Sequence, residues 1–446
     1  MTRSLPDYIV SYLNKYSLKE YEIEWQFKSG INNVIVVPAI AEFENIKFLL
    51  SSLAKNDSKY FDSTIVLFVV NNSIIATEEV KTDNQKSINY LRSIIYNNTN
   101  AKYVNDVKQA GLLIGFIDAA SKGKELGEKN SGVGLARKIG LDLALTIFDY
   151  SKKSKKLIIC LDSDCTVKQN YLTAIVTDFN KLNNNAAVIE FAHDIDGKDK
   201  EITAIIPYEI FLRYYVEGLK YCGSEYAYYS IGSTTVCVAD AYVKVGGMNK
   251  RKAGEDFYFL EKLAKNYNIH KINSTTVYPS NRSSWRVPFG TGQRVTRFFK
   301  NTHNEFQLFD PAVFEVVKEW LDLYNNIECS EPKKILNNSK LIHKELYKFL
   351  ISQNYREQWE KIIDNSKSAN QLLHQKKIWF DAFKTLKLIH HLRDTAFPNI
   401  NMFDALDEFF IKLKIDNNIN RNDNDIPELG VQRQYLRILR EISINC

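Results

Sequence analysis

Hydrophobic positions in the first 300 residues follow two alternating patterns. Short, continuous apolar runs, typical of strands buried on both faces of a parallel sheet, occur at 34–37, 64–70, 112–117, 157–161 and 187–191. Between them, apolar residues recur every three or four positions, as on one face of a helix, at 44–55, 87–96, 134–150 and 171–182. We expect Pro38 to stop the first strand. The alternation predicts an α/β fold in which a mostly parallel sheet is flanked by helices.

The pattern changes after about residue 305, where strand-like runs give way to helical patterns rich in Lys, Glu, Leu and Ile. Helices are predicted at 311–325, 340–352, 356–363, 369–392, 402–414 and 431–442. A chain of 446 residues exceeds what one hydrophobic core usually organises. The predicted parts are an N-terminal helical extension (1–30), an α/β domain (31–304) and a C-terminal all-helical domain (305–446).

Charge and cysteine usage narrow the class of protein. The net charge of +6 suits an anionic substrate or weak peripheral contact with an acidic membrane surface, but it is too slight to indicate nucleic-acid binding. The six cysteines form no C-x-x-C pair and no disulfide or zinc framework, which fits a reducing compartment. The start of the chain lacks the apolar core of a signal peptide, and no transmembrane segment is apparent. We expect a cytoplasmic location, with room for peripheral contact at the inner membrane face.

Two carboxylates follow the apolar run at 157–161, in the segment Asp162-Ser163-Asp164. In an extended chain, residues i and i+2 point the same way, so both carboxylates can reach one hard cation. Carboxylate oxygens suit Mg²⁺ or Mn²⁺, and such a cation would neutralise a departing diphosphate. A divalent-metal site is therefore favoured over the simpler interpretation, a solvated acidic loop.

Polar residues also follow two other predicted strands. Glu42 comes shortly after the first strand, and Asn71 ends the second. Ligands of open α/β sheets bind beyond the carboxyl ends of the strands, where all three polar clusters are expected to meet. The sequence therefore predicts a ligand site at that edge of the sheet.

A second carboxylate pair, Glu255-Asp256, precedes an apolar helical pattern. Acidic side chains at the start of a helix are stabilised by the helix dipole, which is the structural interpretation. The catalytic interpretation is a general base, because adjacent carboxylates perturb each other's pKa and one can approach neutrality. Spacing alone leaves both open.

Arginines and glycines cluster at 279–294, where Gly and Pro predict an irregular loop. Arg282, Arg286 and Arg294 could clamp a diphosphate there, and the alternative is a solvated surface loop. Gly132-Val133-Gly134 opens a helix and could allow close backbone approach to a phosphate. That signal is weak, because the lysine and hydroxyl of a P-loop are missing.

In this order, the segments resemble the family 2-like glycosyltransferases with the GT-A fold, over about residues 30–300. The residues that carry the resemblance are Val36-Val37-Pro38 with Glu42, Gly134-Leu135-Ala136-Arg137-Lys138, Asp162-Ser163-Asp164, the segment from Gly232 to Gly246-Gly247, and Glu255-Asp256. The family usually has Asn where Lys138 stands. It also commonly has Asp where Asn71 stands, and this difference leaves the identity of the nucleotide open.

The resemblance implies a transferase that moves a sugar from a nucleotide-diphosphate sugar to an acceptor hydroxyl, with a saccharide or lipid-linked acceptor. It implies that Asp162 and Asp164 hold Mn²⁺ or Mg²⁺ and that Asp256, beside Glu255, is the base of an inverting displacement. The expected donor-binding residues are Pro38, Glu42, Asn71, Arg137, Asp162, Ser163, Arg282, Arg286 and Arg294.

Three alternatives stay open at the level of sequence. A retaining transferase of the same fold would carry the same D-x-D motif. A non-catalytic sugar-nucleotide-binding or assembly protein would bind the donor only, although the intact Glu255-Asp256 pair speaks against it. A nucleotidyltransferase would show a Gly- and Lys/Arg-rich loop after its first strand, which Pro38-Ala39-Ile40-Ala41 is not.

Overall fold

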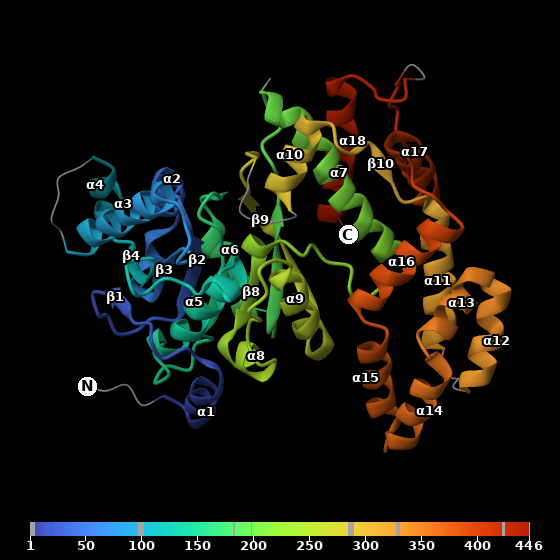
Figure 1. The fold of residues 1–446 in the computed structure, drawn as a ribbon, viewed down its shortest axis with the longest axis horizontal. Helices are drawn as coiled ribbons and strands as arrows, with labels where there is room; N and C mark the ends of the chain where they lie inside the picture. Colours follow the sequence, from blue (N-terminus) through green and yellow to red (C-terminus); the bar gives the residue numbers. More distant parts are fainter. Residues whose placement is uncertain are drawn as a thin grey trace. The chain divides into compact units, whose positions relative to one another are not determined.

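The computed structural model describes residues 5–96, 102–181, 183–197, 199–283, 290–326, 331–421 and 424–445 (Figure 1). They form two compact units. Among the described residues, the first unit, called the sheet unit, contains 5–194, 230–281 and 290. The second, called the helical unit, contains 195–229, 282–283 and 291–445. The boundaries of the three predicted domains, 1–30, 31–304 and 305–446, stay a prediction.

A nine-stranded sheet in the order β1-β4-β3-β2-β5-β8-β7-β9-β6 forms the centre of the sheet unit. Its strands are β1 (Ile23–Trp25), β2 (Asn33–Ala39), β3 (Thr64–Asn71), β4 (Leu113–Ala119), β5 (Leu157–Cys160), β6 (Thr166–Val167), β7 (Ala186–Phe191), β8 (Thr235–Val238) and β9 (Ile269–Tyr278). Strands β4, β3, β2 and β5 are parallel, β7 pairs in parallel with β9, and β1, β8 and β6 run antiparallel to their neighbours. Every residue of β2, β3 and β5 is buried, as the continuous apolar runs predict.

Helices flank this sheet, so the predicted fold class is confirmed (Figure 1). They are α1 (Asp7–Tyr16), α2 (Phe43–Ala54), α3 (Glu78–Ile95), α4 (Lys102–Ala110), α5 (Val133–Ile147), α6 (Tyr171–Lys181), α8 (Ala239–Lys244) and α9 (Glu255–Asn266). Helix α5 is the one that positions the candidate site, and it packs against both β2 and β3. Gly140 permits that contact, since a Cβ atom there would lie 2.5 Å from Val36 Cγ1.

The prediction that Pro38 stops the first strand is wrong, because β2 continues to Ala39 and Pro38 pairs with Val69. The carbonyl of Val36 accepts from the N–H of Leu161, so that residue faces β5. Pro38, two residues later, faces the same side, beyond the last paired residue of β5. No N–H is needed there, so proline is tolerated inside the strand.

Helices dominate the second unit, as predicted for the C-terminal region. They are α7 (Lys200–Tyr221), α10 (Thr291–Lys300), α11 (Pro311–Asn325), α12 (Pro332–Ile342), α13 (Lys344–Ser352), α14 (Tyr355–Asn365), α15 (Ala369–Trp379), α16 (Ala382–Thr395), α17 (Met402–Lys412) and α18 (Leu429–Asn445). A short antiparallel pair, β10 (Gln307–Leu308) with β11 (Ile400–Asn401), adds the only strands described in this unit. Buried aromatic side chains such as Trp320 and Trp359 form much of its core.

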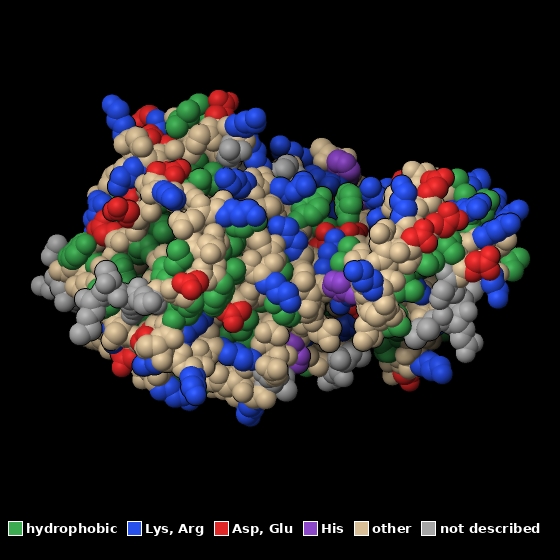
Figure 2. All heavy atoms as spheres, turned by 90° about the horizontal axis from the view of Figure 1, so that it is seen from below, with side chains coloured by type: hydrophobic (Ala, Val, Ile, Leu, Met, Phe, Trp, Pro, Cys, Tyr) green, Lys and Arg blue, Asp and Glu red, His purple; other side chains and the backbone are tan. Residues whose placement is uncertain are grey.

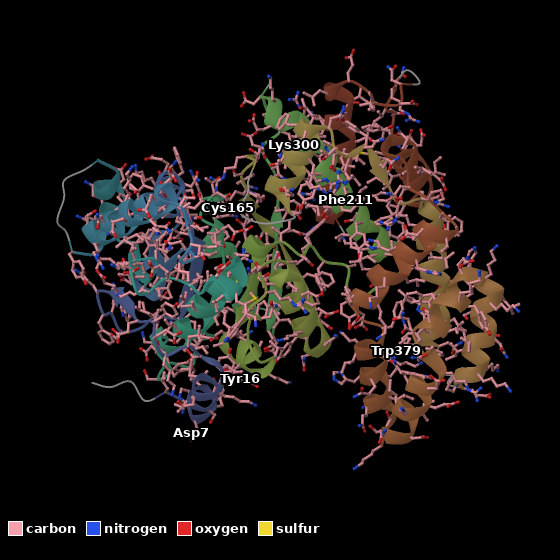
Figure 3. The ribbon with its side chains drawn as sticks, viewed as in Figure 1. Asp7, Tyr16, Cys165, Phe211, Lys300 and Trp379 are labelled. Atoms are coloured by element: carbon pink, nitrogen blue, oxygen red, sulfur yellow. The ribbon has the colours of Figure 1, made fainter. Side chains whose placement is uncertain are left out.

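Two predicted helices of this unit are each divided into two. The helix expected at 340–352 breaks at His343, whose Nδ1 accepts from the N–H of Glu345 at 3.2 Å and caps α13. The helix expected at 369–392 breaks at Phe380, and Asp381 caps α16 by accepting from the N–H of Lys384 at 2.9 Å. A capping side chain satisfies the free N–H groups of a new helix start, which apolar spacing alone does not reveal. Trp379, labelled in Figure 3, marks the end of α15.

On the face shown in Figure 2, the Lys and Arg side chains of the described residues lie among acidic and apolar ones. This distribution agrees with the small net charge of +6. Over the residues described, none of the helices combines the length and apolar character that a bilayer-spanning helix requires.

Candidate functional site

The segment Asp162-Ser163-Asp164 forms a turn at the carboxyl end of β5. The N–H of Cys165 donates to the carbonyl of Asp162 at 3.2 Å, so the prediction of an extended segment is wrong. The turn still brings the acidic side chains together, because one ligand atom each of Asp162, Asp164 and Cys165 lies within 4.8 Å of the others. Both aspartates are partly exposed, whereas Ser163 and Cys165 are buried. Figure 3 labels Cys165 in this region of the sheet unit.

The donor set of this turn fits a hard divalent cation in part. Two partly exposed carboxylates suit Mn²⁺ or Mg²⁺, which keep several water ligands. Burial raises the pKa of the Cys165 thiol well above its ordinary value, and Asp164 adds to the rise. A neutral thiol is a poor ligand for these cations, so Asp162 and Asp164 are the residues that would hold one.

Arg137 joins the two acidic pairs of the sequence. Its side chain is 4% exposed, and it projects from α5. Its Nη2 pairs with Asp162 Oδ1, and its Nη1 lies 3.1 Å from Glu255 Oε1. Burial alone would lower the pKa of Arg137, but Asp162 and Glu255 raise it above the ordinary value, so the guanidinium stays charged. The sequence predicted donor contact for Arg137, and the structure shows it engaged by the protein's own carboxylates.

Gly232 makes room for this guanidinium. A Cβ atom at position 232 would lie 2.0 Å from Arg137 Nη1 and 2.3 Å from Nη2, far closer than atoms can approach. The resemblance included the segment that begins at Gly232 without indicating the role of this glycine. Within the structure, its role is to let the Arg137 side chain lie flat against the backbone just before β8.

The glycines that open α5 pack closely against another segment of the chain, and the phosphate contact suggested for them stays a prediction. A Cβ atom at Gly134 would lie 2.3 Å from the Arg251 carbonyl oxygen, and one at Gly132 would lie 2.6 Å from Lys252 Cα. The space beside both glycines is therefore filled by the chain at 251–252. This close approach holds the residues that lead into α9 against α5, and so brings Glu255 to Arg137.

Glu255 and Asp256 occupy the first turn of α9, as predicted. Glu255 is 3% exposed, and its burial raises its pKa to about 7, opposed by Arg137 and assisted by Asp256. Burial also raises the pKa of Asp256, again opposed by Arg137. Asp256 is only half-buried, and its Oδ1 accepts from the N–H of Phe257 at 2.7 Å. The pair therefore offers one carboxylate locked by Arg137 and one that is more accessible.

The predicted nucleoside contacts at the strand ends are buried. Glu42 is 2% exposed and its Oε2 accepts from Asn45 Nδ2 at 2.5 Å. Asn71 is 5% exposed, and its Nδ2 donates to the carbonyls of Ala39 at 3.2 Å and Val69 at 3.1 Å. The amide group of Asn71 thus ties β3 to the end of β2. A contact of either residue with a nucleoside stays a prediction.

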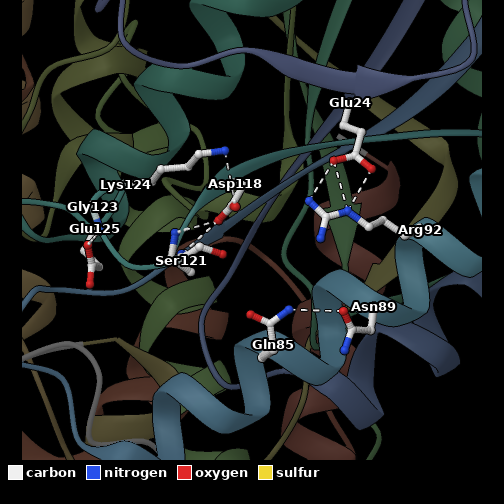
Figure 4. Close-up of polar contacts among 10 residues, drawn as sticks. Glu24, Gln85, Asn89, Arg92, Asp118, Ser121, Gly123, Lys124 and Glu125 are labelled. Carbon is white, nitrogen blue, oxygen red and sulfur yellow. Dashed lines mark hydrogen bonds and ion pairs between the residues drawn. The ribbon is translucent and has the colours of Figure 1, made fainter.

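Asp118 is a strand-end acid that the sequence reasoning missed. It lies near the end of β4, where its Oδ1 accepts from the N–H of Ser121 at 2.9 Å and its Oδ2 lies 3.6 Å from Lys124 Nζ (Figure 4). Burial alone would raise the pKa of Asp118, but these partners lower it, so the carboxylate is charged. The sequence pattern could have identified Asp118, because it follows the apolar run at 112–117 just as Asp162 follows the run at 157–161.

Glu24 of the edge strand β1 and Arg92 of α3 form an ion pair, in which Arg92 Nε lies 2.8 Å from Glu24 Oε1 (Figure 4). Both side chains are partly exposed. The pair ties the short strand β1 to α3, and at its partly exposed position it contributes little to the free energy of unfolding.

Lys138, where the family usually has Asn, belongs to a separate buried cluster. Its Nζ lies 2.8 Å from Asp142 Oδ2. The hydroxyls of Tyr12 and Tyr242 donate to Asp142 Oδ1 at 2.8 and 2.6 Å. The cluster ties α1, whose ends Asp7 and Tyr16 are labelled in Figure 3, to α5 and α8. The unusual lysine is thus explained by a structural ion pair.

The three predicted diphosphate-binding arginines are not all described. Arg286 lies outside the described residues, and Arg282 and Arg294 belong to the helical unit. Arg294 lies in α10, so the prediction of an irregular loop is wrong from Thr291 onward. Its Nη1 lies 2.5 Å from Glu305 Oε2. The apolar residues Val295 and Phe298 pack into the core of the unit and explain why a helix forms there.

Comparison with known proteins gives distant structural matches. No family model matches the sequence, and no curated protein matches it. The structure of S. aureus TarS 1–349 in complex with UDP-GlcNAc matches at 13% identity and a TM-score of 0.37, over 78% of this chain and 91% of that one. Mannosyltransferase PcManGT from Pyrobaculum calidifontis, in complex with GDP-Man and Mn²⁺, matches at 12% identity and a TM-score of 0.33, over 98% of this chain and 94% of that one.

These matches extend over most of the chain, but similarity at this level carries no conclusion about activity. The fold class is instead established by the chain's own sheet order and its flanking helices. Within that fold, the D-x-D turn and the Glu255-Asp256 pair meet on one buried arginine.

Proposed function

We propose that this chain is a metal-dependent glycosyltransferase that moves a sugar from a nucleotide-diphosphate sugar to an acceptor hydroxyl on a saccharide or lipid-linked acceptor, with inversion. The observation that carries the proposal is the contact of Arg137 with both Asp162 and Glu255. It joins a carboxylate pair suited to a metal diphosphate with a carboxylate pair suited to proton removal.

The donor half of the site is the turn after β5. Asp162 and Asp164 are the proposed ligands of the cation, and one oxygen of Asp162 also pairs with Arg137. When bound, Mn²⁺ or Mg²⁺ would neutralise the charge that develops on the leaving diphosphate. Asp162 would use its second oxygen or a bridging water. The contributions of Pro38, Glu42, Asn71 and Ser163 to donor binding belong to this proposal, and contact of Arg282, Arg286 and Arg294 with the diphosphate stays a prediction from the sequence.

The acceptor half of the site is the start of α9. Asp256 is the proposed base, because it is the more accessible of the two acids and its pKa is raised toward the range in which a carboxylate removes a proton efficiently. Glu255 is held by Arg137 and would orient the first turn of the helix rather than meet the acceptor. Asp256 would take the proton of the acceptor hydroxyl as the hydroxyl oxygen attacks the anomeric carbon. The nucleotide diphosphate would leave from the opposite face.

Two variants test this division. Asp256→Asn should bind the donor almost as tightly as the wild type while turnover falls by roughly 10²-fold or more, because only the base is lost. Asp164→Ala should instead abolish Mn²⁺-dependent nucleotide binding. Calorimetry with UDP-GlcNAc, GDP-mannose and related donors, with and without Mn²⁺, measures binding, and product analysis measures transfer.

The outcomes separate the alternatives. Donor binding without transfer to any acceptor tested would favour a non-catalytic nucleotide-sugar-binding protein. A product whose anomeric configuration matches the donor would indicate a retaining transferase. Full turnover in Asp256→Asn would refute the assignment of the base.

A further inference from the structure

The buried guanidinium of Arg137 pairs with two carboxylates at once. It faces Asp162 and Glu255 directly, Asp164 lies two residues after Asp162, and Asp256 follows Glu255 in the chain. Arg137 and Glu255 are almost fully buried, so their interaction is weakly screened by solvent. The Arg137 guanidinium therefore pairs with one carboxylate from each half of the site.

The position of the guanidinium is closely constrained. Gly232 lies against one face, with an added Cβ only 2.5 Å from Arg137 Cζ. Arg137 Nε is buried and makes no hydrogen bond to any described residue, while the two terminal nitrogens bind carboxylates. Leaving a buried N–H unsatisfied costs free energy, so the two ion pairs dictate where the side chain lies.

We propose that Arg137 is a positioning residue that couples the two halves of the site by competing with a divalent cation for the Asp162 carboxylate. This inference rests on the proposed function, because it takes the D-x-D turn as the metal site. A guanidinium held beside the turn lowers the affinity for a cation, and cation binding in turn leaves Arg137 more strongly paired with Glu255. Coupling of this kind is reciprocal, so the state of the acceptor half also changes cation affinity.

A purely structural role for Arg137 makes the opposite prediction. If Arg137 only holds the fold together, its removal loosens the turn and weakens cation binding. If Arg137 competes with the cation, its removal strengthens cation binding. The sign of the change in Mn²⁺ affinity therefore distinguishes the two roles.

The test measures Mn²⁺ alone binding to the full chain by electron paramagnetic resonance, with no nucleotide and no turnover. Arg137→Gln should bind Mn²⁺ about tenfold more tightly than wild type, which is the effect of one unit charge near a divalent cation even at a water-like dielectric constant. Arg137→Lys keeps the charge and should stay within about threefold of wild type. Unchanged or weaker Mn²⁺ binding in a folded Arg137→Gln variant would overturn the inference.

The matched control is Lys138→Gln, which removes the neighbouring buried cation of the same helix. Lys138 pairs with Asp142, away from the acidic turn. This variant should lose thermal stability but keep the Mn²⁺ affinity of wild type. A gain in Mn²⁺ affinity equal to that of Arg137→Gln would show a general effect of charge and would overturn the specific role of Arg137.

A double-mutant cycle extends the test to the acceptor half and covers the case in which Arg137→Gln fails to fold. Glu255→Gln should weaken Mn²⁺ binding by about three- to tenfold, because Arg137 then pairs with Asp162 alone. In an Arg137→Lys background, where one ammonium group cannot span both carboxylates, this effect should shrink by at least half. An undiminished effect would overturn the coupling through Arg137.

The proposed function and the inference fail in different ways. Absence of Mn²⁺ binding to the wild type would overturn the donor half of the proposed function, and the inference with it. Mn²⁺ binding that does not respond to Arg137 would overturn the inference alone.

Discussion

Substituting Gly232 with alanine probes the contact that orders the site without removing any charged group. The added Cβ would lie 2.0 Å from Arg137 Nη1, so the guanidinium would have to move by about 1 Å or more to restore a normal contact. No backbone strain accompanies the change, because Gly232 does not adopt a left-handed conformation. The whole effect should therefore arise from displacement of Arg137.

The expected size of the effect on turnover and on stability follows from the displacement of Arg137. A misplacement of about 1 Å in a catalytic constellation costs roughly 10²-fold in rate, so kcat/KM should fall by about that factor. Overpacking of a close-packed site lowers the free energy of unfolding by about 1–3 kcal/mol. Both numbers are larger than the effect of an alanine at a surface position.

The measurements are steady-state transfer assays and urea denaturation, with Gly127→Ala as the matched control. Gly127 has φ −61° and an added Cβ there would meet no atom within 4 Å, so this variant should behave as wild type. If Gly232→Ala keeps both wild-type stability and wild-type kcat/KM, the close packing of Arg137 against Gly232 is not what orders the site, and the reasoning fails.

Two further predictions concern pH and the N-terminal helix. The pKa of Glu255 in the folded protein is about 7, above its ordinary 4.5, so the folded state binds this proton more tightly than the unfolded state. Its contribution to the free energy of unfolding should therefore fall as pH rises from about 4.5 to about 7, and Glu255→Gln should remove that slope in urea denaturation; an unchanged slope would contradict the raised pKa. Gly247→Ala should lower the free energy of unfolding by about 2 kcal/mol or more, because Gly247 has φ +68° and a Cβ would lie 1.9 Å from the Tyr12 hydroxyl. Equilibrium denaturation measures the loss, which Tyr12→Phe in the same background should partly restore; wild-type stability of Gly247→Ala would refute the tight contact.

Much of the fold could be predicted from local patterns. The runs at 64–70 and 157–161 became β3 and β5, since a strand buried on both faces must be apolar throughout. The predicted helix start at Glu255 was also correct, because acidic residues followed by apolar spacing mark a helix N-terminus. Short or edge strands such as β1 and β6 escaped notice, since three or two residues carry too little periodicity.

Local patterns were insufficient where the surroundings of a residue come from a distant segment of the chain. Pro38 looked like a strand terminator, yet it lies past the end of β5, where no N–H is required. The Gly132-Val133-Gly134 motif suggested phosphate contact, but it gave no sign that both glycines pack against the backbone at Arg251 and Lys252. In both cases the neighbouring backbone belongs to another part of the chain.

The sequence by itself determined the α/β alternation, the helical C-terminal region and the chemical character of the two acidic pairs, because these depend on residue type and spacing along the chain. Only the tertiary structure decided that both pairs share Arg137 and that Gly232 makes room for its guanidinium. It also decided that the Asn71 amide donates a hydrogen bond to the backbone of β2. The physical reason is that ion pairs, close packing and burial depend on distances between atoms of residues far apart in the chain. Those distances exist only once β5, α5 and α9 have been brought together.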